Sequence, residues 1–189
     1  LPDLSPIHRI DRDTAGLVLL STQRSDRGAY QALFREQRVH KTYQAIAPYR
    51  PELGFPREHH SRMQESGHFI RMHEVAGPPN SHTRLTLLEH NTHWARYQLE
   101  PISGKRHQLR VHMAALGIGI LGDGLYPEVN DAPEGDFSRP LRLLAQAIAF
   151  TDPLTQQQRH FHSQYTLGAL PPEPAPSGQQ TWQGLPANA

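Results

Sequence analysis

Cysteine is absent from the 189-residue chain, which excludes a disulfide framework, a thiol nucleophile and a thiolate zinc site. The chain also lacks any run of about 20 apolar residues that could cross a bilayer. Aromatic residues are few, at 7%. Because a single core of ordinary size suits this length, we expect one soluble domain without a membrane partner. A reducing compartment fits the missing cysteines, and we expect a cytoplasmic protein.

Net charge is low, at +1, but the charges are unevenly distributed. Residues 1–50 carry eight basic and five acidic side chains, residues 51–120 carry eight and six, and residues 121–189 carry three and seven. A basic excess in the first two thirds fits a surface that faces a polyanion. The same asymmetry is equally typical of uneven charge on a solvated surface.

Hydrophobic periodicity predicts a mixture of strands and helices. Apolar or alternating runs predict strands over Leu17–Ser21, Lys41–Ala47, Thr83–Glu89, Trp94–Glu100, Leu141–Phe150 and Arg159–Ser163, the first of them buried. Helical spacing predicts one helix from Ser25 or Asp26 to about Gln37, and a second over His107–Leu116 with Arg106, Arg110 and His107 on its polar side. Residues 51–67 lack periodicity and predict a polar loop. The Pro-rich tail from Pro171 predicts disorder or a segment laid over the surface.

The densest polar cluster is the sequence IHRIDRDTAG at residues 7–16, directly before the first predicted strand. Loops that precede a rigid element often carry catalytic groups. Arg9 and Arg12 flank the carboxylate of Asp11, and cations at short range favour the ionised form of a carboxylate. An ionised aspartate is prepared as a nucleophile or base. The alternative is a surface loop in which ion pairs close a turn.

A second cluster, GKRHQLRVH at residues 104–112, combines the start of a predicted helix with adjacent cations. Backbone N–H groups and basic side chains at such a helix start could hold phosphates. Taken alone, the pattern is more typical of a solvated basic face.

These clusters carry a family resemblance. HRIDRDTAGLVLLS at residues 8–21 resembles the HRLDxxTSGLLLL signature of the RluA-type family of RNA pseudouridine synthases, which modify uridines in ribosomal and transfer RNA. KTYQA at residues 41–45 resembles the family's K-x-Y-x-A strand, and residues 104–126 resemble its GRTHQLRxHxxxxGxPIxGDxxY segment. LLAQAIAFTDPLT at residues 143–155 is similar to its closing strand and turn. The common order of these signatures makes coincidence negligible.

The resemblance implies an α+β fold, with a mixed, mostly antiparallel central sheet, flanking helices and a cleft lined by the signatures. It implies a catalytic domain over residues 1–170, followed by a Pro-rich tail over 171–189. It assigns the catalytic aspartate to Asp11, the tyrosine that stacks on the target base to Tyr43, and the arginine that pairs with the aspartate to Arg110. The residues that it implies for RNA binding are His8, Arg9, Arg12, Thr14, Lys105, Arg106, His107 and Gln108.

The implied partner is ribosomal or transfer RNA, and we expect a monomer that needs no cofactor and no metal. Lys105 and Arg106 depart from the commoner Arg-Thr of the family, which puts phosphate contacts and substrate choice in doubt. Family members normally carry a further strand, and often an S4-type domain, before the first signature, so the resemblance predicts an N-terminally truncated catalytic domain.

Two alternatives compete with this interpretation. One is a non-catalytic RNA-binding module or RNA folding helper that uses the same cleft, and it leaves the catalytic set of Asp11, Tyr43 and Arg110 without a purpose. The other is a metal enzyme that uses His59-His60 or His160-Phe161-His162. Neither histidine pair lies near a carboxylate at a recognisable ligand spacing, which argues against the metal enzyme.

Overall fold

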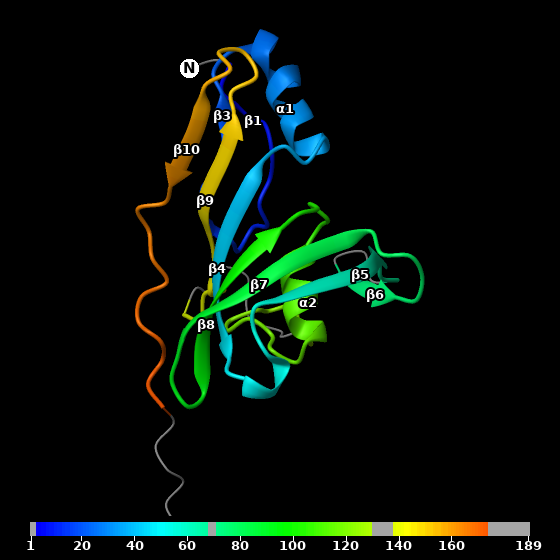
Figure 1. Ribbon diagram of the computed structural model, residues 1–189, viewed down its shortest axis with the longest axis vertical. Coiled ribbons are helices and arrows are strands. Elements are labelled where there is room, and N and C mark those ends of the chain that lie inside the picture. Colours follow the sequence, from blue (N-terminus) through cyan, green and yellow to red (C-terminus); the bar gives the residue numbers. More distant parts are fainter. Residues whose placement is uncertain (1–2, 68–70, 130–137, 174–189) are drawn as a thin grey trace, which may run out of the picture.

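The computed structural model describes residues 3–67, 71–129 and 138–173, and an eight-stranded sheet dominates it (Figure 1). The strand order is β10-β9-β4-β8-β7-β5-β6, and β2 pairs with β9 off this path. Within the described ranges, β2 and β9 form the one parallel pair. The expected α+β fold with a mixed, mostly antiparallel sheet is therefore confirmed. The strands are β2 Ala15–Gly16, β4 His40–Pro48, β5 Arg57–Glu65, β6 Met72–Val75, β7 Ser81–His90, β8 Trp94–Pro101, β9 Leu143–Thr151 and β10 Gln158–His162.

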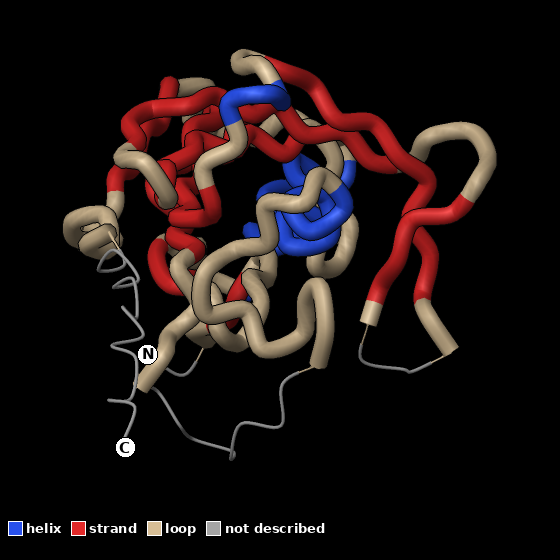
Figure 2. Tube along the Cα trace, turned by 90° about the horizontal axis from the view of Figure 1, so that it is seen from below, coloured by secondary structure: helices blue, strands red, loops and turns tan. Residues whose placement is uncertain are grey.

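Two helices cover different parts of the sheet. Helix α2, Gln108–Ala115, packs against β5, β6, β7 and β8, and Figure 2 shows the strands arching over it. Helix α1, Arg27–Arg35, follows a 3₁₀ turn at Arg24–Asp26 and packs at the other end of the molecule against β9 (Figure 1). A second 3₁₀ turn spans Pro51–Leu53. Neither α-helix is long and apolar enough to span a bilayer, as far as the described residues show.

The core forms where the alternating strands β7 and β8 turn one face to α2. Along β8, Ala95, Tyr97 and Leu99 are completely buried, and the residues between them are partly exposed. This period of two is the pattern from which strands over Thr83–Glu89 and Trp94–Glu100 are predicted, and the paired strands β7 and β8 confirm both. The predicted helix around residues 107–116 and the predicted strands at β9 and β10, which pair with each other, are confirmed as well.

The prediction of a buried strand over Leu17–Ser21 is wrong. Only Leu20–Ser21 forms a strand, β3, and it pairs with the two-residue β1, Ser5–Pro6. Leu20 is 49% exposed. The rest of this apolar run bonds to other segments: the Leu17 N–H donates to Ala145 O of β9, and Leu19 O accepts the Ile7 N–H.

The predicted polar loop over residues 51–67 is also wrong, because β5 occupies Arg57–Glu65. The inward side chains of β5 include His59 and Ser61, which are polar, so a search for alternating apolar residues misses this strand. Of the predicted tail, residues 174–189 lie outside the described residues. Pro171 and Glu173 contact the β7–β8 turn, where Asn91 Nδ2 donates to Pro171 O at 3.0 Å and Thr92 Oγ1 donates to Glu173 Oε1 at 2.6 Å.

The N-terminal loop is seated on β9 by a glycine. Gly16 has a φ of +110°, and a Cβ built there would lie 2.3 Å from the carbonyl oxygen of Ala145. No larger residue fits this approach, and glycine also adopts the positive φ at least cost. The parallel pairs Ala15 with Leu144 and Gly16 with Ala145 thus fix the end of the polar loop at residues 7–14.

Candidate active site

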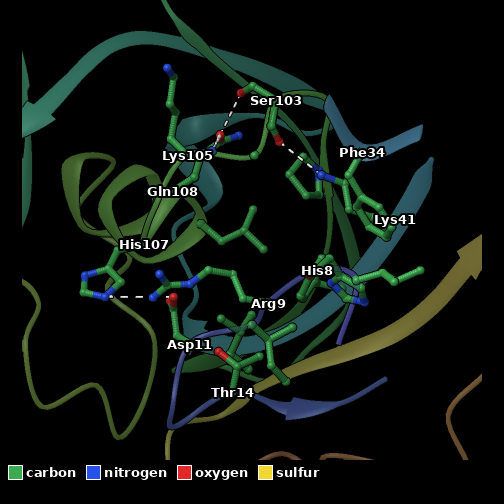
Figure 3. A pocket seen from close by; sticks show the side chains of 17 residues that line it. His8, Arg9, Asp11, Thr14, Phe34, Lys41, Ser103, Lys105, His107 and Gln108 are labelled. Carbon is green, nitrogen blue, oxygen red and sulfur yellow. Dashed lines mark hydrogen bonds and ion pairs between the residues drawn. The ribbon is translucent and has the colours of Figure 1, made fainter. Parts of the chain in front are cut away.

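A cavity of about 290 Å³ lies where the N-terminal loop, β4 and the start of α2 meet (Figure 3). Its size is close to the lower end of ordinary small-molecule sites, which span about 300 to 1,000 Å³. Segments far apart in the sequence therefore form one site. The lining residues are Ile7, His8, Arg9, Ile10, Asp11, Thr14, Phe34, Lys41, Tyr43, Pro101, Ser103, Gly104, Lys105, His107, Gln108, Leu109 and Leu143.

The carboxylate of Asp11 reaches the wall of this cavity from a tight turn. The turn is closed by Thr14, whose buried N–H donates to the Asp11 carbonyl at 3.0 Å. The Asp11 side chain is 17% exposed, with its oxygens 3.8 Å from Arg110 Nη1 and 3.9 Å from His107 Nε2 (Figure 3). These separations are too long for direct hydrogen bonds, and Arg110 supplies a charge opposite to that of the carboxylate. The carboxylate is thus held beside a cation and remains open to a ligand.

Arg110 is almost completely buried, with 2% of its surface exposed, which corrects its prediction on the polar side of the helix. Asp123 makes this burial possible through two hydrogen bonds, from Nε at 2.8 Å and from Nη2 at 2.6 Å. A bidentate pair fixes the plane of a guanidinium. The remaining nitrogen, Nη1, is thereby aimed at Asp11.

His107 approaches Asp11 from a left-handed backbone conformation, with a φ of +54°, at the residue before α2. Such a φ is unfavourable outside glycine and is found most often where function requires it. The hydroxyl of Tyr126 accepts from the N–H of Met72 at 2.8 Å and lies 2.9 Å from His107 Nδ1. Tyr126 thus links Met72 to Nδ1 of His107 and leaves Nε2 as the nitrogen that faces Asp11. Burial lowers the pKa of His107, the charge of Asp11 opposes this, and the cation of Arg110 adds to the lowering, so the site favours the neutral ring.

Tyr43 stands in β4 beside an irregularity of the sheet. The register of β4 against β9 shifts between Thr42 and Tyr43, and bulges of this kind redirect side chains near active sites. Burial raises the pKa of Tyr43 to about 12, and the charge of Asp11 contributes. The phenol is therefore protonated at neutral pH, with its ring on the cavity wall.

Lys41 is a cavity residue to which the sequence analysis assigned no role. It precedes Tyr43 by two positions in β4, so both side chains emerge on the same face of the strand. Burial lowers the pKa of Lys41, and Nζ donates to Ser103 O at 3.3 Å (Figure 3). The spacing of two from Tyr43 is the sequence signal that could have identified it.

Two of the residues expected to bind RNA have their polar groups engaged within the protein. His8 Nε2 accepts the Leu19 N–H at 2.9 Å, and its ring stacks on Phe34 with centroids 4.5 Å apart. The amide of Gln108 accepts from Ser103 Oγ and Lys105 N, and donates to His82 O and Thr83 Oγ1. Both side chains therefore shape the cavity wall.

The cations expected to bind RNA lie in two groups. Arg9 and Lys105 are exposed and line the cavity. Arg12 and Arg106 are not among the lining residues, and Arg106 Nη1 lies 3.9 Å from Glu65 Oε1. The basic surface thus extends from the mouth of the cavity onto the neighbouring surface.

Comparisons with known proteins were made by sequence and by structure. A family described as RNA pseudouridylate synthase matches residues 2–115. The chain is 32% identical over 164 residues to the dual-specificity RNA pseudouridine synthase RluA of Pasteurella multocida, which covers 82% of this chain and 71% of that protein. It is also 32% identical to the ribosomal large subunit pseudouridine synthase C of Vibrio cholerae, over 85% of this chain and 51% of that one. The chain therefore spans only about half of the second relative.

Solved structures show the same fold. Human RNA pseudouridylate synthase domain containing 1 superposes with a TM-score of 0.71 at 24% identity, covering 85% of this chain and 69% of that chain. Human RNA pseudouridylate synthase domain containing 4 gives a TM-score of 0.67 at 23% identity, covering 89% and 72%. At these identities the likeness establishes the architecture.

Proposed function

The chain belongs to the RNA pseudouridine synthase family, and on that premise we propose that it isomerises uridine to pseudouridine in ribosomal or transfer RNA, with Asp11 as the catalytic carboxylate. The observation that carries this proposal is the position of Asp11, at the wall of a base-sized cavity and 3.8 Å from the buried cation of Arg110. Release of tritium from RNA labelled at C5 of uridine tests it, because only formation of the new C–C bond displaces that atom.

The chemistry needs one ionised carboxylate in a site that excludes water. The N1–C1′ bond of uridine breaks, the uracil turns, a C5–C1′ bond forms, the C5 proton leaves and N1 gains a proton. In these reaction steps Asp11 acts either as a nucleophile at C1′ or as a base that removes a ribose proton to give a glycal. Arg110 lies beside the carboxylate and orients it in both routes, and Asp123 positions Arg110.

A binding module without catalysis is the weaker alternative. Such a module gains nothing from an aspartate in a pocket that faces a polyanion, because the carboxylate repels phosphate. The proposed partner is RNA alone, bound in the cytoplasm. The proposed active form is a monomer, because a single chain supplies Asp11, Tyr43 and Arg110. Arg9, Arg12, Thr14, Lys105 and Arg106 are proposed to contact the RNA around the extruded uridine.

Tyr43 has two proposed roles, and its replacement by Phe separates them. The ring stacks on the extruded base, which offsets an unstacking cost of a few kcal/mol, and the hydroxyl takes part in loss of the C5 proton. We expect Tyr43→Phe to bind RNA as wild type does and to turn over at least about tenfold more slowly, within the usual range for general acid–base groups. Tyr43→Leu is the comparison, since it also loses stacking and should weaken RNA binding. Full activity of Tyr43→Phe would restrict the residue to stacking.

Lys105 and Arg106 are expected to act through charge. Replacing both with Ala should weaken RNA binding and reduce the slope of log affinity against log salt by roughly one unit for each phosphate that the variant no longer neutralises. Arg35→Ala/Arg38→Ala removes two exposed cations from the end of α1 and serves as the matched control. If the two double variants show the same slope, the cations at 105 and 106 face solvent.

The proposed reaction requires no metal, because it is an isomerisation without net oxidation or reduction and the attacking group is a carboxylate. We expect turnover in excess EDTA to stay within about twofold of turnover without it. Tritium release measures this directly. Loss of activity in EDTA that zinc restores would return the histidine-based metal enzyme to consideration.

A further inference from the structure

A group of polar side chains lies on the outer face of β5 and β7, separate from the active-site cavity. The antiparallel register places Glu58 opposite Arg84 and His60 opposite His82. Residues two apart in a strand share a face, so all four side chains emerge on one side of the sheet. The residues between them turn inward, as the burial of Thr83 shows. Pairing of two strands thus assembles a cluster that sequence spacing alone does not reveal.

Two imidazoles and one carboxylate converge within this cluster. Glu58 Oε2 lies 3.3 Å from His60 Nε2 and 3.2 Å from His82 Nε2. The two rings stack with their centroids 3.9 Å apart and their planes 19° apart, so the half-exposed His60 ring must turn about its side-chain bonds before both nitrogens point at one ion. One ligand atom from each residue lies within 4.8 Å of the other two.

The separations of Glu58 Oε2 from the two imidazole nitrogens are close to the edge lengths of a small coordination polyhedron. Zinc binds imidazole nitrogen and carboxylate oxygen at about 2.0 to 2.2 Å in a tetrahedron, which puts neighbouring ligand atoms about 3.3 to 3.6 Å apart. His82 Nε2 supports the same interpretation, because it is buried and makes no hydrogen bond of acceptable geometry with any described residue. A metal ion would satisfy this nitrogen.

We propose that Glu58, His60 and His82 form a binding site for one divalent transition-metal ion of the zinc class. Arg84 selects against harder cations, because its Nε donates to the second carboxylate oxygen, Glu58 Oε1, at 2.8 Å and offsets the single negative charge of the cluster. Calcium and magnesium prefer several charged oxygens, whereas imidazole suits zinc, nickel and copper. The same hydrogen bond fixes the orientation of the carboxylate.

A neighbouring histidine cluster on the inner face is not the proposed site. His112 is completely buried, and both of its nitrogens lie at hydrogen-bonding distance from hydroxyls of Ser61, Ser81 and Thr83. His59 Nε2 lies 2.8 Å from Glu74 Oε1, closer than two ligands of one ion. This inner set is a satisfied hydrogen-bond network.

The proposed ion would clamp β5 to β7 beside the active-site wall. Its three protein ligands come from both strands and leave one coordination position for water. The backbone of His82 also holds that wall, because its N–H donates to Ser103 Oγ and its carbonyl accepts from Gln108 Nε2, both at 2.9 Å. Metal binding therefore adds stability to this strand segment, whereas the two hydrogen bonds that position Ser103 and Gln108 form without the ion, so turnover does not depend on it.

The test is calorimetric titration of the metal-free full chain with zinc chloride, together with the visible spectrum of the cobalt(II) form. We expect one ion per chain, d–d bands of a four-coordinate site, and affinity at least tenfold weaker in His60→Ala and in Glu58→Gln. Both residues are about half exposed, so these variants should fold. His160→Ala/His162→Ala removes another i, i+2 histidine pair, from β10, and should bind as wild type does.

Three results would overturn the proposal. They are the absence of saturable binding, unchanged affinity in both His60→Ala and Glu58→Gln, and a loss of binding in His59→Ala that equals the loss in His60→Ala. Zinc should also raise the unfolding temperature of the wild type and leave that of His60→Ala unchanged. This readout is independent of turnover, so the proposal stands or falls separately from the proposed enzymatic function.

Discussion

Asp11→Asn is expected to abolish pseudouridine formation and to leave folding and RNA affinity nearly intact. Asparagine has the shape of aspartate, and the backbone bond from Thr14 to the Asp11 carbonyl does not involve the side chain. The amide is neither a nucleophile nor a base, so we expect turnover to fall by a factor on the order of 10³ or more. Removing a negative charge from an RNA-facing cavity should, if anything, strengthen binding.

Tritium release from RNA labelled at C5 of uridine measures this loss, and filter binding measures affinity. Asp13→Asn is the matched control, since Asp13 is an exposed carboxylate in the same loop and does not line the cavity. Turnover of Asp11→Asn within tenfold of wild type would eliminate Asp11 as the catalytic carboxylate.

Asp123→Asn is expected to have the largest effect on stability. The substitution leaves the guanidinium of Arg110 buried without its bidentate partner, and breaking a buried ion pair on one side costs about 3 to 5 kcal/mol. Asp123 Oδ1 also accepts the N–H groups of Leu125 and Tyr126. The substitution therefore weakens the backbone turn that carries Tyr126, the partner of His107. Turnover should fall as well, because Arg110 is no longer aimed at Asp11.

Urea unfolding measures the change in the free energy of unfolding. The double variant Arg110→Met/Asp123→Leu separates the two consequences, because removing both charges should recover much of the stability and none of the activity. A destabilisation by Asp123→Asn below about 1 kcal/mol would contradict the assignment of Asp123 as the buried partner of Arg110.

The sequence predicts the elements whose burial alternates cleanly. Tyr97 and Leu99 belong to such a strand in the β7–β8 hairpin, whereas β9 is predicted from a long, mostly apolar run. The prediction fails at β5, where His59 and Ser61 occupy inward positions that apolar periodicity expects to be hydrophobic. It fails also at Leu17–Ser21, where three separate partners share an apolar run.

The site is predicted in part for similar reasons. The ordered signatures indicate Asp11, Tyr43 and Arg110, and the structure places all three at or beside one cavity, although their roles remain proposals. An arginine in an amphipathic helix is expected to face solvent, so the burial of Arg110 could not be inferred until Asp123 was seen to reach it. The approach of His82 to Glu58 could not be predicted either, because it depends on the pairing of β5 with β7, which lie apart in the sequence.

The seating of the N-terminal loop on β9 also bears on the order in which the protein becomes active during synthesis. Asp11 leaves the ribosome long before Ala145, yet its loop joins the main sheet through the pairing of Gly16 with that residue. Contacts between distant segments form late because loop closure must precede them. A nascent chain that already contains Asp11, Tyr43 and Arg110 therefore has no seated catalytic carboxylate. We therefore expect translation products that end before β9 to be inert toward RNA.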